Sequence, residues 1–233
     1  MALDVWMLRA AGAHPEAVAL FRAYGWSGSA FTFGQSQRWA DIAARVEAIT
    51  GASPEPPALV RRPTGGGLVD HRDDWTYALV FPAHSAPAAE RPAALYARVH
   101  RLLAAALAEA GVAARLKVCP PPGECSEEVD RSASAGPSVC FEEPVPGDLL
   151  DPATGAKIAG AAMKRTRDGV LLQGSVVAGA LASPAAREAL RDAFAARFAQ
   201  SFGAATDTLA QPPESTLEPL RATFRSAPWN RRR

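Results

Sequence analysis

One stretch of the sequence carries most of the information about the fold: Arg61-Arg62-Pro63-Thr64-Gly65-Gly66-Gly67-Leu68-Val69-Asp70-His71. Three consecutive glycines let a backbone take positive φ angles and approach a ligand closely, and their N–H groups can hold a phosphate or an acyl carbonyl. The two arginines before them can bind an anion. Taken alone, the same residues also fit a glycine-rich hairpin turn with solvated arginines.

The glycine spacing excludes two common nucleotide-binding loops. No Gly-Lys-Ser or Gly-Lys-Thr follows the three glycines, so the stretch is not a Walker A loop. The spacing also differs from the Gly-x-Gly-x-x-Gly pattern of dinucleotide-binding folds. The ligand of this loop must therefore be inferred from other parts of the chain.

The sequence on both sides of the loop predicts a mixture of helices and strands. Apolar residues at helical spacing, with a Ser183-Pro184 start signal for the last one, predict helices over residues 1–12, 41–50, 93–110 and 183–202. Aromatic and β-branched runs predict strands over residues 30–34, 59–62 and 75–81, and a hairpin over residues 157–177. Residues 14–24 form a further amphipathic segment, and residues 119–138, rich in Pro, Gly and Ser, predict a surface loop.

The composition is that of a globular protein, with 48% hydrophobic and 21% charged residues in a chain of 233. It favours one domain over residues 1–205 and a loosely held tail over residues 206–233. A formal net charge of +1 gives no reason to expect a nucleic-acid partner, and no apolar run approaches membrane-spanning length. Three cysteines argue against a disulfide framework and favour the reducing cytoplasm.

Two further features carry reactive side chains. Lys157 lies beside small residues in Lys157-Ile158-Ala159-Gly160, where it can meet a carbonyl or a phosphate, although an isolated strand lysine is more often solvated. Cys140 lies between apolar neighbours, where a cysteine is usually a small buried hydrophobe unless a base or a positive charge activates it. The spacing of Cys119 and Cys125 predicts no metal site, and the remaining histidines fit no site pattern.

The order of these features resembles that of the biotin/lipoate protein ligase superfamily. Residues 61–67 followed by His71 and Thr76-Tyr77 are similar to its first signature. Lys157-Ile-Ala-Gly, then Arg165, then Gly169-Val-Leu-Leu-Gln-Gly-Ser are similar to its second. Residues 1–4 and 24–37 also fall where the family has its opening helix and first strands, so the likeness covers about residues 1–180.

The resemblance implies an α/β (α+β) fold with a mixed β-sheet flanked by helices, like the catalytic core of class II synthetases and biotin ligases. It implies that Lys157 contacts the acyl carbonyl or an acyl-adenylate. It further implies a set of substrate-binding residues from both signatures: Arg62, Thr64, Gly65, Gly66, Gly67, His71, Gly160, Gly174 and Ser175.

Two reactions compete within the lipoate-protein ligase A and cysteine-type octanoyltransferase branch that the chain resembles. Octanoyltransferases of the cysteine type carry a Cys-Phe pair upstream of the lysine signature, where Cys140-Phe141 stands here. The resemblance then predicts transfer from acyl carrier protein, through a Cys140 thioester, to a lysine of a lipoyl domain or a glycine-cleavage H protein, without a cofactor or metal. The alternatives are an ATP- and magnesium-dependent lipoate-protein ligase, and a non-catalytic member that binds acyl groups or lipoyl domains.

The sequence departs from the family pattern at several positions. Gln173 stands where the family often has a histidine, and Asp70 and Arg72 replace a usual apolar residue and a frequent acid beside His71. About fifty residues follow the second signature, too few for the accessory domain of many stand-alone ligases. A C-terminal segment of this length favours the transferase over the ligase.

Overall fold

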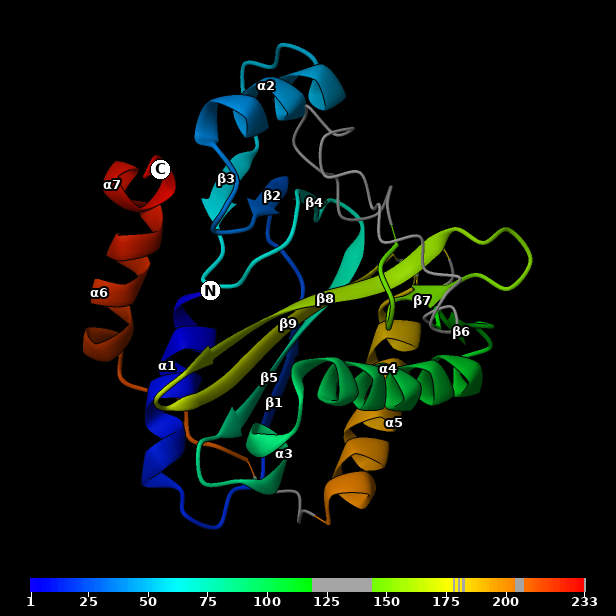
Figure 1. Cartoon of the computed structure of the whole chain (residues 1–233). Helices are drawn as coiled ribbons and strands as arrows, with labels where there is room; N and C mark the ends of the chain where they lie inside the picture. Colours follow the sequence, from blue (N-terminus) through cyan, green and yellow to red (C-terminus); the bar gives the residue numbers. More distant parts are fainter. Residues whose placement is uncertain (119–143, 178, 180, 182, 204–207, 233) are drawn as a thin grey trace, which may run out of the picture.

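The computed structural model describes residues 1–118, 144–177, 179, 181, 183–203 and 208–232. The largest element of these residues is an antiparallel sheet of six strands in the order β1-β5-β9-β8-β7-β6 (Figure 1). Its strands are β1 (Leu20–Tyr24), β5 (Asp74–Pro82), β9 (Gly169–Val177), β8 (Lys157–Thr166), β7 (Leu149–Leu150) and β6 (Arg115–Leu116). The predicted strand over residues 75–81 and the predicted hairpin over residues 157–177 are thus confirmed.

The two central strands, β5 and β9, are buried on both faces. All nine residues of β5 are buried, although a strand with one solvated face would alternate between buried and exposed positions. Its odd-numbered residues, Trp75 to Phe81, belong to the main hydrophobic core, whereas Ala78 and Val80 belong to a second, smaller one. Each face of the sheet must therefore have its own cover.

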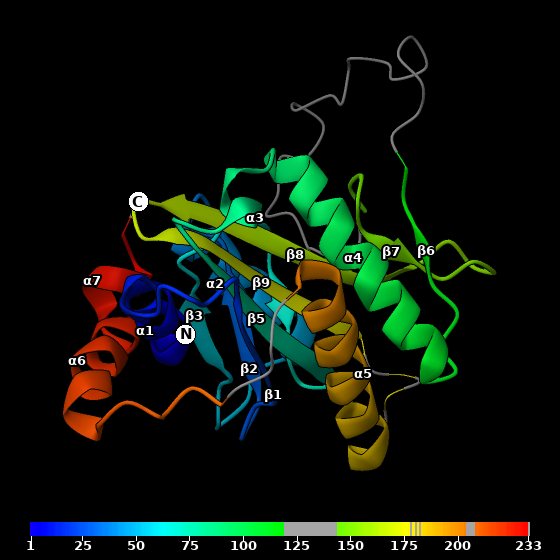
Figure 2. The ribbon, with the colours of Figure 1, turned by 90° about the horizontal axis from the view of Figure 1, so that it is seen from below.

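Helices α4 (Pro92–Glu109) and α5 (Pro184–Phe202) cover the first face (Figure 2). Leu95, Val99 and Leu103 of α4 repeat at helical spacing, and these residues join Phe194 and Phe198 of α5 in the main core. Helix α5 begins as the sequence predicts, because the Ser183 hydroxyl accepts a hydrogen bond from the Ala186 N–H at 3.1 Å. The predicted helices over residues 93–110 and 183–202 are confirmed.

Helix α1 (Ala2–Ala10) covers part of the second face and continues into a short 3₁₀ turn at Ala11–Ala13. Met7, Leu8 and Ala11 pack against Ala78, Val80 and Leu171 of the central strands. Farther along the same face, the strands carry the polar residues Thr76, Gln173 and Ser175, all buried. This polar end of the second face is where the candidate site lies.

A second, three-stranded sheet has the order β3-β2-β4 and lies beside helix α2 (Trp39–Thr50) (Figure 1). Strand β2 (Ala30–Phe33) runs parallel to β3 (Ala58–Arg61) and antiparallel to β4 (Val69–Asp70). The predicted α/β class with sheets flanked by helices is confirmed, with one refinement: the mixed pairing is confined to the small sheet. The predicted helix over residues 41–50 and the strands near residues 30–34 and 59–62 are confirmed as well.

Some elements differ from the sequence prediction. The amphipathic segment at residues 14–24 ends in strand β1, because Leu20 to Tyr24 pair with β5 at the edge of the large sheet. The short helix α3 (Ala86–Ala89) and the two-residue strands were not predicted, since so few residues carry no periodicity. The predicted loop at residues 119–138 lies outside the described residues.

The expectation of a loosely held tail is wrong for residues 208–232. Helices α6 (Glu214–Arg225) and α7 (Ala227–Asn230) pack beside α1 and β3 (Figures 1 and 2). The fully buried Arg61 donates to the carbonyl oxygens of Asn230 (3.0 Å) and Gln37 (2.8 Å), and the Trp229 indole donates to the Arg61 carbonyl (2.8 Å). Arg61 therefore ties the C-terminal helices to the strand that precedes the glycine-rich loop.

No helix among the described residues is both long enough and apolar enough to cross a membrane.

Candidate active site

Arg62 holds the glycine-rich loop from within. Its guanidinium donates to the carbonyl oxygens of Gly65 (2.9 Å) and Gly67 (2.8 Å) and to the Thr32 hydroxyl (2.7 Å). Gly66 takes a φ of 86°, a backbone conformation that other residues rarely adopt. The sequence predicted that Arg62 would bind an anion. In the structure, its guanidinium instead donates to carbonyl oxygens of the loop.

The loop lies directly against the end of β2. A Cβ atom on Gly34 would overlap with the Gly66 carbonyl, so only glycine allows this approach. The Gln35 backbone N–H donates to the Thr64 carbonyl at 3.1 Å, and the Gln35 side chain donates to the Pro63 carbonyl at 2.6 Å. These contacts fix the shape of the loop independently of any ligand.

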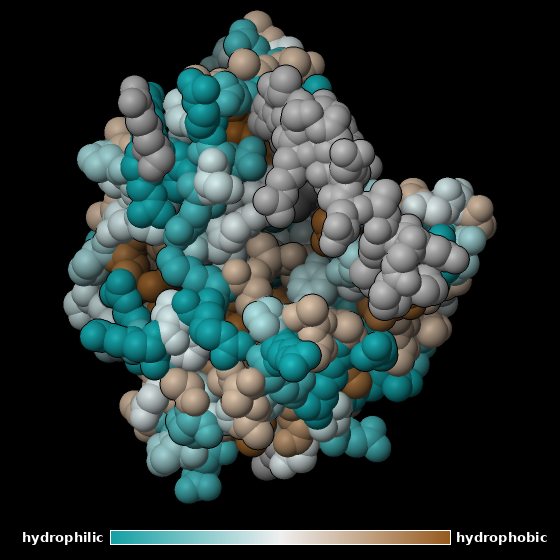
Figure 3. Space-filling model, in the orientation of Figure 1, coloured by the Kyte–Doolittle hydropathy of each residue, from teal (hydrophilic) through white to brown (hydrophobic). Residues whose placement is uncertain are grey.

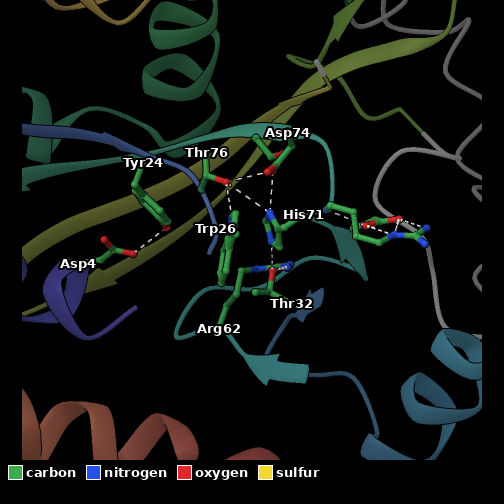
Figure 4. A network of polar contacts seen from close by, with 11 residues as sticks. Asp4, Tyr24, Trp26, Thr32, Arg62, His71, Asp74 and Thr76 are labelled. Carbon is green, nitrogen blue, oxygen red and sulfur yellow. Dashed lines mark hydrogen bonds and ion pairs between the residues drawn. The ribbon is translucent and has the colours of Figure 1, made fainter. Parts of the chain in front are cut away.

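His71 lies at the centre of a buried polar network (Figure 4). Its Nδ1 is 2.7 Å from Asp74 Oδ2, and its Nε2 is 2.7 Å from the Thr32 hydroxyl. The hydroxyl accepts a hydrogen bond from Arg62, so its own O–H can donate to Nε2 while Nδ1–H donates to Asp74. Trp26 stacks on the imidazole with ring centroids 4.3 Å apart, which fixes the plane of the ring.

Asp74 is shared by several donors. Its Oδ2 accepts from the Thr76 hydroxyl at 3.1 Å and from the Ser175 hydroxyl, in addition to His71. Its Oδ1 is buried and has no hydrogen-bond partner among the described residues. A buried carboxylate oxygen without a donor is costly, so Oδ1 is the one unsatisfied side-chain acceptor of this network among the described residues.

Lys157 lines the same pocket as His71 and forms an ion pair with Asp148. Its Nζ is 2.8 Å from Asp148 Oδ2, with the lysine side chain 5% exposed and the aspartate fully buried. A Cβ atom on Gly160 would overlap with Lys157 Cε and would lie 2.7 Å from its Nζ. The glycine of the Lys157-Ile-Ala-Gly160 signature thus leaves the space that the lysine side chain fills.

Gln173 joins helix α1 to the glycine-rich loop. Its side-chain carbonyl accepts from the Thr64 hydroxyl at 2.9 Å, and its amide donates to Asp4 at 2.7 Å. Burial alone would raise the pKa of Asp4, but the positive charges of the Met1 amine and of Arg22, 2.5 Å away, lower that pKa below its usual value. Asp4 therefore holds the Gln173 amide as an ionised acceptor.

A pocket runs between these residues and contains polar groups from both signatures. Its volume is about 30 Å³, room for a water molecule or two. Apolar atoms of Met1, Val69, Ala161 and Ala162 form part of its lining. Six of the predicted site residues line it: Arg62, His71, Lys157, Gly160, Gly174 and Ser175.

The remaining predicted site residues lie elsewhere. Thr64 is buried behind Gln173, which lines the pocket, and Gly65 and Gly67 point their carbonyl oxygens at Arg62. Gly66 contributes the turn of the loop. Cys140, the predicted nucleophile, lies outside the described residues, so its place relative to Lys157 stays a prediction.

Several polar residues of the site were not predicted from the sequence: Thr32, Asp74, Asp148 and Asp4. Asp74 carried a signal, because an acid three residues after a histidine can reach it across a turn. Asp148, nine positions before Lys157, had no spacing rule to reveal it. Among the described residues, no group of three or more His, Cys, Asp or Glu side chains is arranged as a metal site.

The chain matches known proteins over most of its length. Residues 1–213 match the family model of the lipoyl protein ligase A/B catalytic domain. The octanoyltransferase LipM of Symbiobacterium thermophilum is 29% identical over 238 aligned positions, which cover 87% of this chain and 81% of that protein.

Two solved structures share the fold. Lipoate-protein ligase A bound with ATP aligns with a TM-score of 0.67 at 18% identity, over 99% of this chain and 92% of the other. A bipartite lipoate protein ligase from Thermoplasma acidophilum, solved in a study of that ligase and its E2 lipoyl domain, aligns with a TM-score of 0.58 at 14% identity, over 98% and 91%. At these identities the two structures speak for the fold alone.

Proposed function

Because the chain belongs to the lipoyl protein ligase A/B catalytic domain family, we propose that it is a protein octanoyltransferase that works through a thioester on Cys140. Membership makes it an enzyme of lipoyl or octanoyl transfer. We place the active site in this pocket because Lys157 from the second signature and His71 and Arg62 from the first all line it. The likeness to an octanoyltransferase supports the choice of reaction.

In the first half-reaction, the Cys140 thiolate attacks the carbonyl carbon of an octanoyl thioester on acyl carrier protein. A carbon–sulfur bond forms, the carbonyl oxygen gains negative charge, and the carrier thiolate leaves and takes up a proton. One thioester replaces another of similar energy, so no ATP is consumed. The Lys157 ammonium, at the pocket, is the group suited to stabilise the oxygen as its charge develops.

In the second half-reaction, a lysine amine of the acceptor protein attacks the octanoyl–Cys140 thioester. An amide bond forms, the cysteine sulfur leaves, and the attacking nitrogen loses a proton. The acceptor that we propose is a lipoyl domain or a glycine-cleavage H protein in the cytoplasm. The T. acidophilum ligase, which shares the fold and was studied together with its E2 lipoyl domain, is a precedent for an acceptor of the first kind.

The pocket imposes one condition on this proposal. A volume of about 30 Å³ is too small for an eight-carbon chain, so lining side chains must move apart when the chain enters. The flexible Met1 side chain is the most adaptable of the apolar groups that line it. On the face of the molecule shown in Figure 3, hydrophilic residues are interspersed with hydrophobic ones.

The decisive experiment is an intact-mass measurement after incubation with octanoyl-acyl carrier protein. We expect the wild-type protein to gain the mass of one octanoyl group and Cys140→Ala to gain none. Cys119→Ala and Cys125→Ala are the matched controls and should still form the adduct. No adduct on the wild type, together with lipoate-dependent exchange between ATP and pyrophosphate, would replace the transferase by the ligase. If neither the adduct nor the exchange reaction is seen, the protein is a non-catalytic binding protein.

A further inference from the structure

We infer that Asp148 is the positioning residue of this site, acting through Lys157. The inference rests on the proposed function, in which Lys157 stabilises the developing negative charge on the thioester oxygen. It assigns to Asp148 the task of holding the ammonium at the place where that charge appears.

The ion pair between Lys157 and Asp148 is buried. The Lys157 side chain is 5% exposed and the Asp148 side chain is fully buried, with 2.8 Å between Nζ and Oδ2. A buried ammonium has lost most of its hydration, and a carboxylate in contact is the usual replacement. Removing the Asp148 carboxylate would take away the buried negative charge that lies 2.8 Å from the lysine nitrogen, so the ammonium would no longer be held at this place.

Asp148 is itself held by α4, by the turn at Val145 and, through Tyr96, by β8. Its Oδ1 accepts from the Tyr96 hydroxyl of α4 at 2.6 Å, and its Oδ2 accepts from the Val145 N–H at 2.7 Å. The Tyr96 hydroxyl also accepts from the Ala161 N–H of β8 at 2.8 Å. Burial, together with the charge of Asp148, raises the pKa of Tyr96 far above its ordinary value, so the phenol remains a donor.

The turn before Asp148 is fixed from the sheet. The Gly147 carbonyl accepts from His100 Nδ1 at 2.5 Å, and His100 Nε2 is 3.0 Å from the Tyr77 hydroxyl. Burial lowers the pKa of His100 to about 4, so the ring is neutral at pH 7, and Nδ1 must carry its proton to reach a carbonyl. Gly147 has a φ of 94°, and a Cβ atom there would overlap with the Tyr96 ring.

These contacts form one continuous path from Tyr77 through His100, Gly147 and Asp148 to Lys157. Both oxygens of Asp148 have partners, in contrast to Asp74, whose Oδ1 has none among the described residues. A carboxylate with every bond fixed can hold its partner in one geometry, which is what charge stabilisation in a transition state requires. Such an arrangement explains why a fully buried acid stands before the lysine signature.

A double-mutant cycle tests the role. Single-turnover formation of the octanoyl–Cys140 adduct is measured for the wild type, Asp148→Asn, Lys157→Met and the double variant. We expect Asp148→Asn to slow the reaction about 10- to 100-fold in the wild-type background, with little change in the half-saturating concentration of octanoyl-acyl carrier protein. In the Lys157→Met background the same change should cost nothing further. The matched control is Asp151→Asn, at a solvated acid on the next turn, which should react like the wild type.

A merely structural role would give a different pattern. If Asp148 only held its turn in place, its loss would slow the reaction as much in the Lys157→Met background as in the wild type, so the same fold-loss in both backgrounds overturns the inference. If Asp148→Asn lacks a cooperative thermal transition, the cycle is run with Tyr96→Phe, and the same two patterns decide. No adduct on the wild type would overturn the proposed function and this role with it, whereas an adduct with equal losses would overturn the role alone.

Discussion

The two sides of the pocket are held in different ways. The histidine wall (Thr32, Arg62, His71 and Asp74) is a web of short bonds between residues of the small sheet, the glycine-rich loop and β5. The lysine wall (Tyr96, His100, Asp148, Lys157 and Gly160) is built around one buried ion pair.

The difference lies in what each carboxylate does. Asp74 fixes the orientation of the His71 ring and leaves Oδ1 without a partner among the described residues. Asp148 pairs with the Lys157 side chain and has both oxygens occupied. The lysine wall is therefore suited to stabilising negative charge in one fixed place, whereas the histidine wall fixes the orientation of an imidazole.

The largest effect should come from Gly160→Ala, which breaks the lysine wall without touching the rest of the fold. The new methyl group would overlap with Lys157 Cε, and the flexible end of that side chain can move away from Asp148. We expect adduct formation to slow by about 10²-fold or more, the usual cost of losing one transition-state donor. The melting temperature should change little.

Gly174→Ala is the contrasting variant in the neighbouring strand. There the methyl group would overlap with the ring of Tyr77, which is fully buried and cannot move aside. Thermal unfolding should therefore show a large loss of stability for Gly174→Ala. If Gly160→Ala and Gly174→Ala lose the same amount of stability, Gly160 is as important to core packing as Gly174, and the proposed difference between them is wrong.

The next effect concerns pH and the support of the lysine wall. Burial lowers the pKa of His100 to about 4 in the folded state, below the value near 6.5 of an unfolded histidine. The unfolded chain takes up this proton first as the pH falls. The stability due to neutral His100 is thus complete above about pH 6.5 and is lost as the pH falls toward 4, by up to about 3 kcal/mol.

Urea unfolding at pH 7.5 and pH 4.5 measures this loss. His100→Gln should be less stable than the wild type at pH 7.5 but should lose less on acidification, because the titrating group is gone. His84→Gln, at an exposed histidine, should keep the pH dependence of the wild type. A His100→Gln variant with undiminished acid sensitivity would assign the effect to other groups.

The smallest effect should come from Asn230→Ala, which weakens the support behind the histidine wall. Its side-chain carbonyl accepts from the Arg61 backbone N–H at 2.8 Å, and its amide donates to the Phe224 carbonyl at 2.8 Å. Losing these buried bonds should cost about 2 kcal/mol of unfolding free energy. Denaturant unfolding measures the loss, with the exposed Arg225→Gln as control.

Adduct formation by Asn230→Ala should stay close to the wild-type rate, because Arg62 keeps its own bonds to the loop. If Asn230→Ala slowed adduct formation as much as Gly160→Ala does, the histidine wall would depend on its support as strongly as the lysine wall. The distinction drawn between them would then be wrong.

The sequence predicted most of the regular elements and six of the residues that line the pocket. The long helices and the β8–β9 hairpin have enough residues for their periodicity to be read. The two signatures are contiguous, so a resemblance could be recognised from them, and it led to Arg62, His71, Lys157 and Ser175 at one pocket. The short strands and the packed C-terminal helices were not predicted, because their positions depend on distant partners such as Arg61.

By itself, then, the sequence determined the family, the α/β class and the glycine and lysine signatures, since each of these is written in neighbouring residues. Only the tertiary structure decided that Arg61 and Arg62 have separate tasks, one holding the C-terminal helices and the other the glycine-rich loop. Only the tertiary structure brought Asp148 and Tyr96 to Lys157. The physical reason is that a buried charge takes its partner from whichever segment the packing brings near, and no local spacing rule encodes that choice.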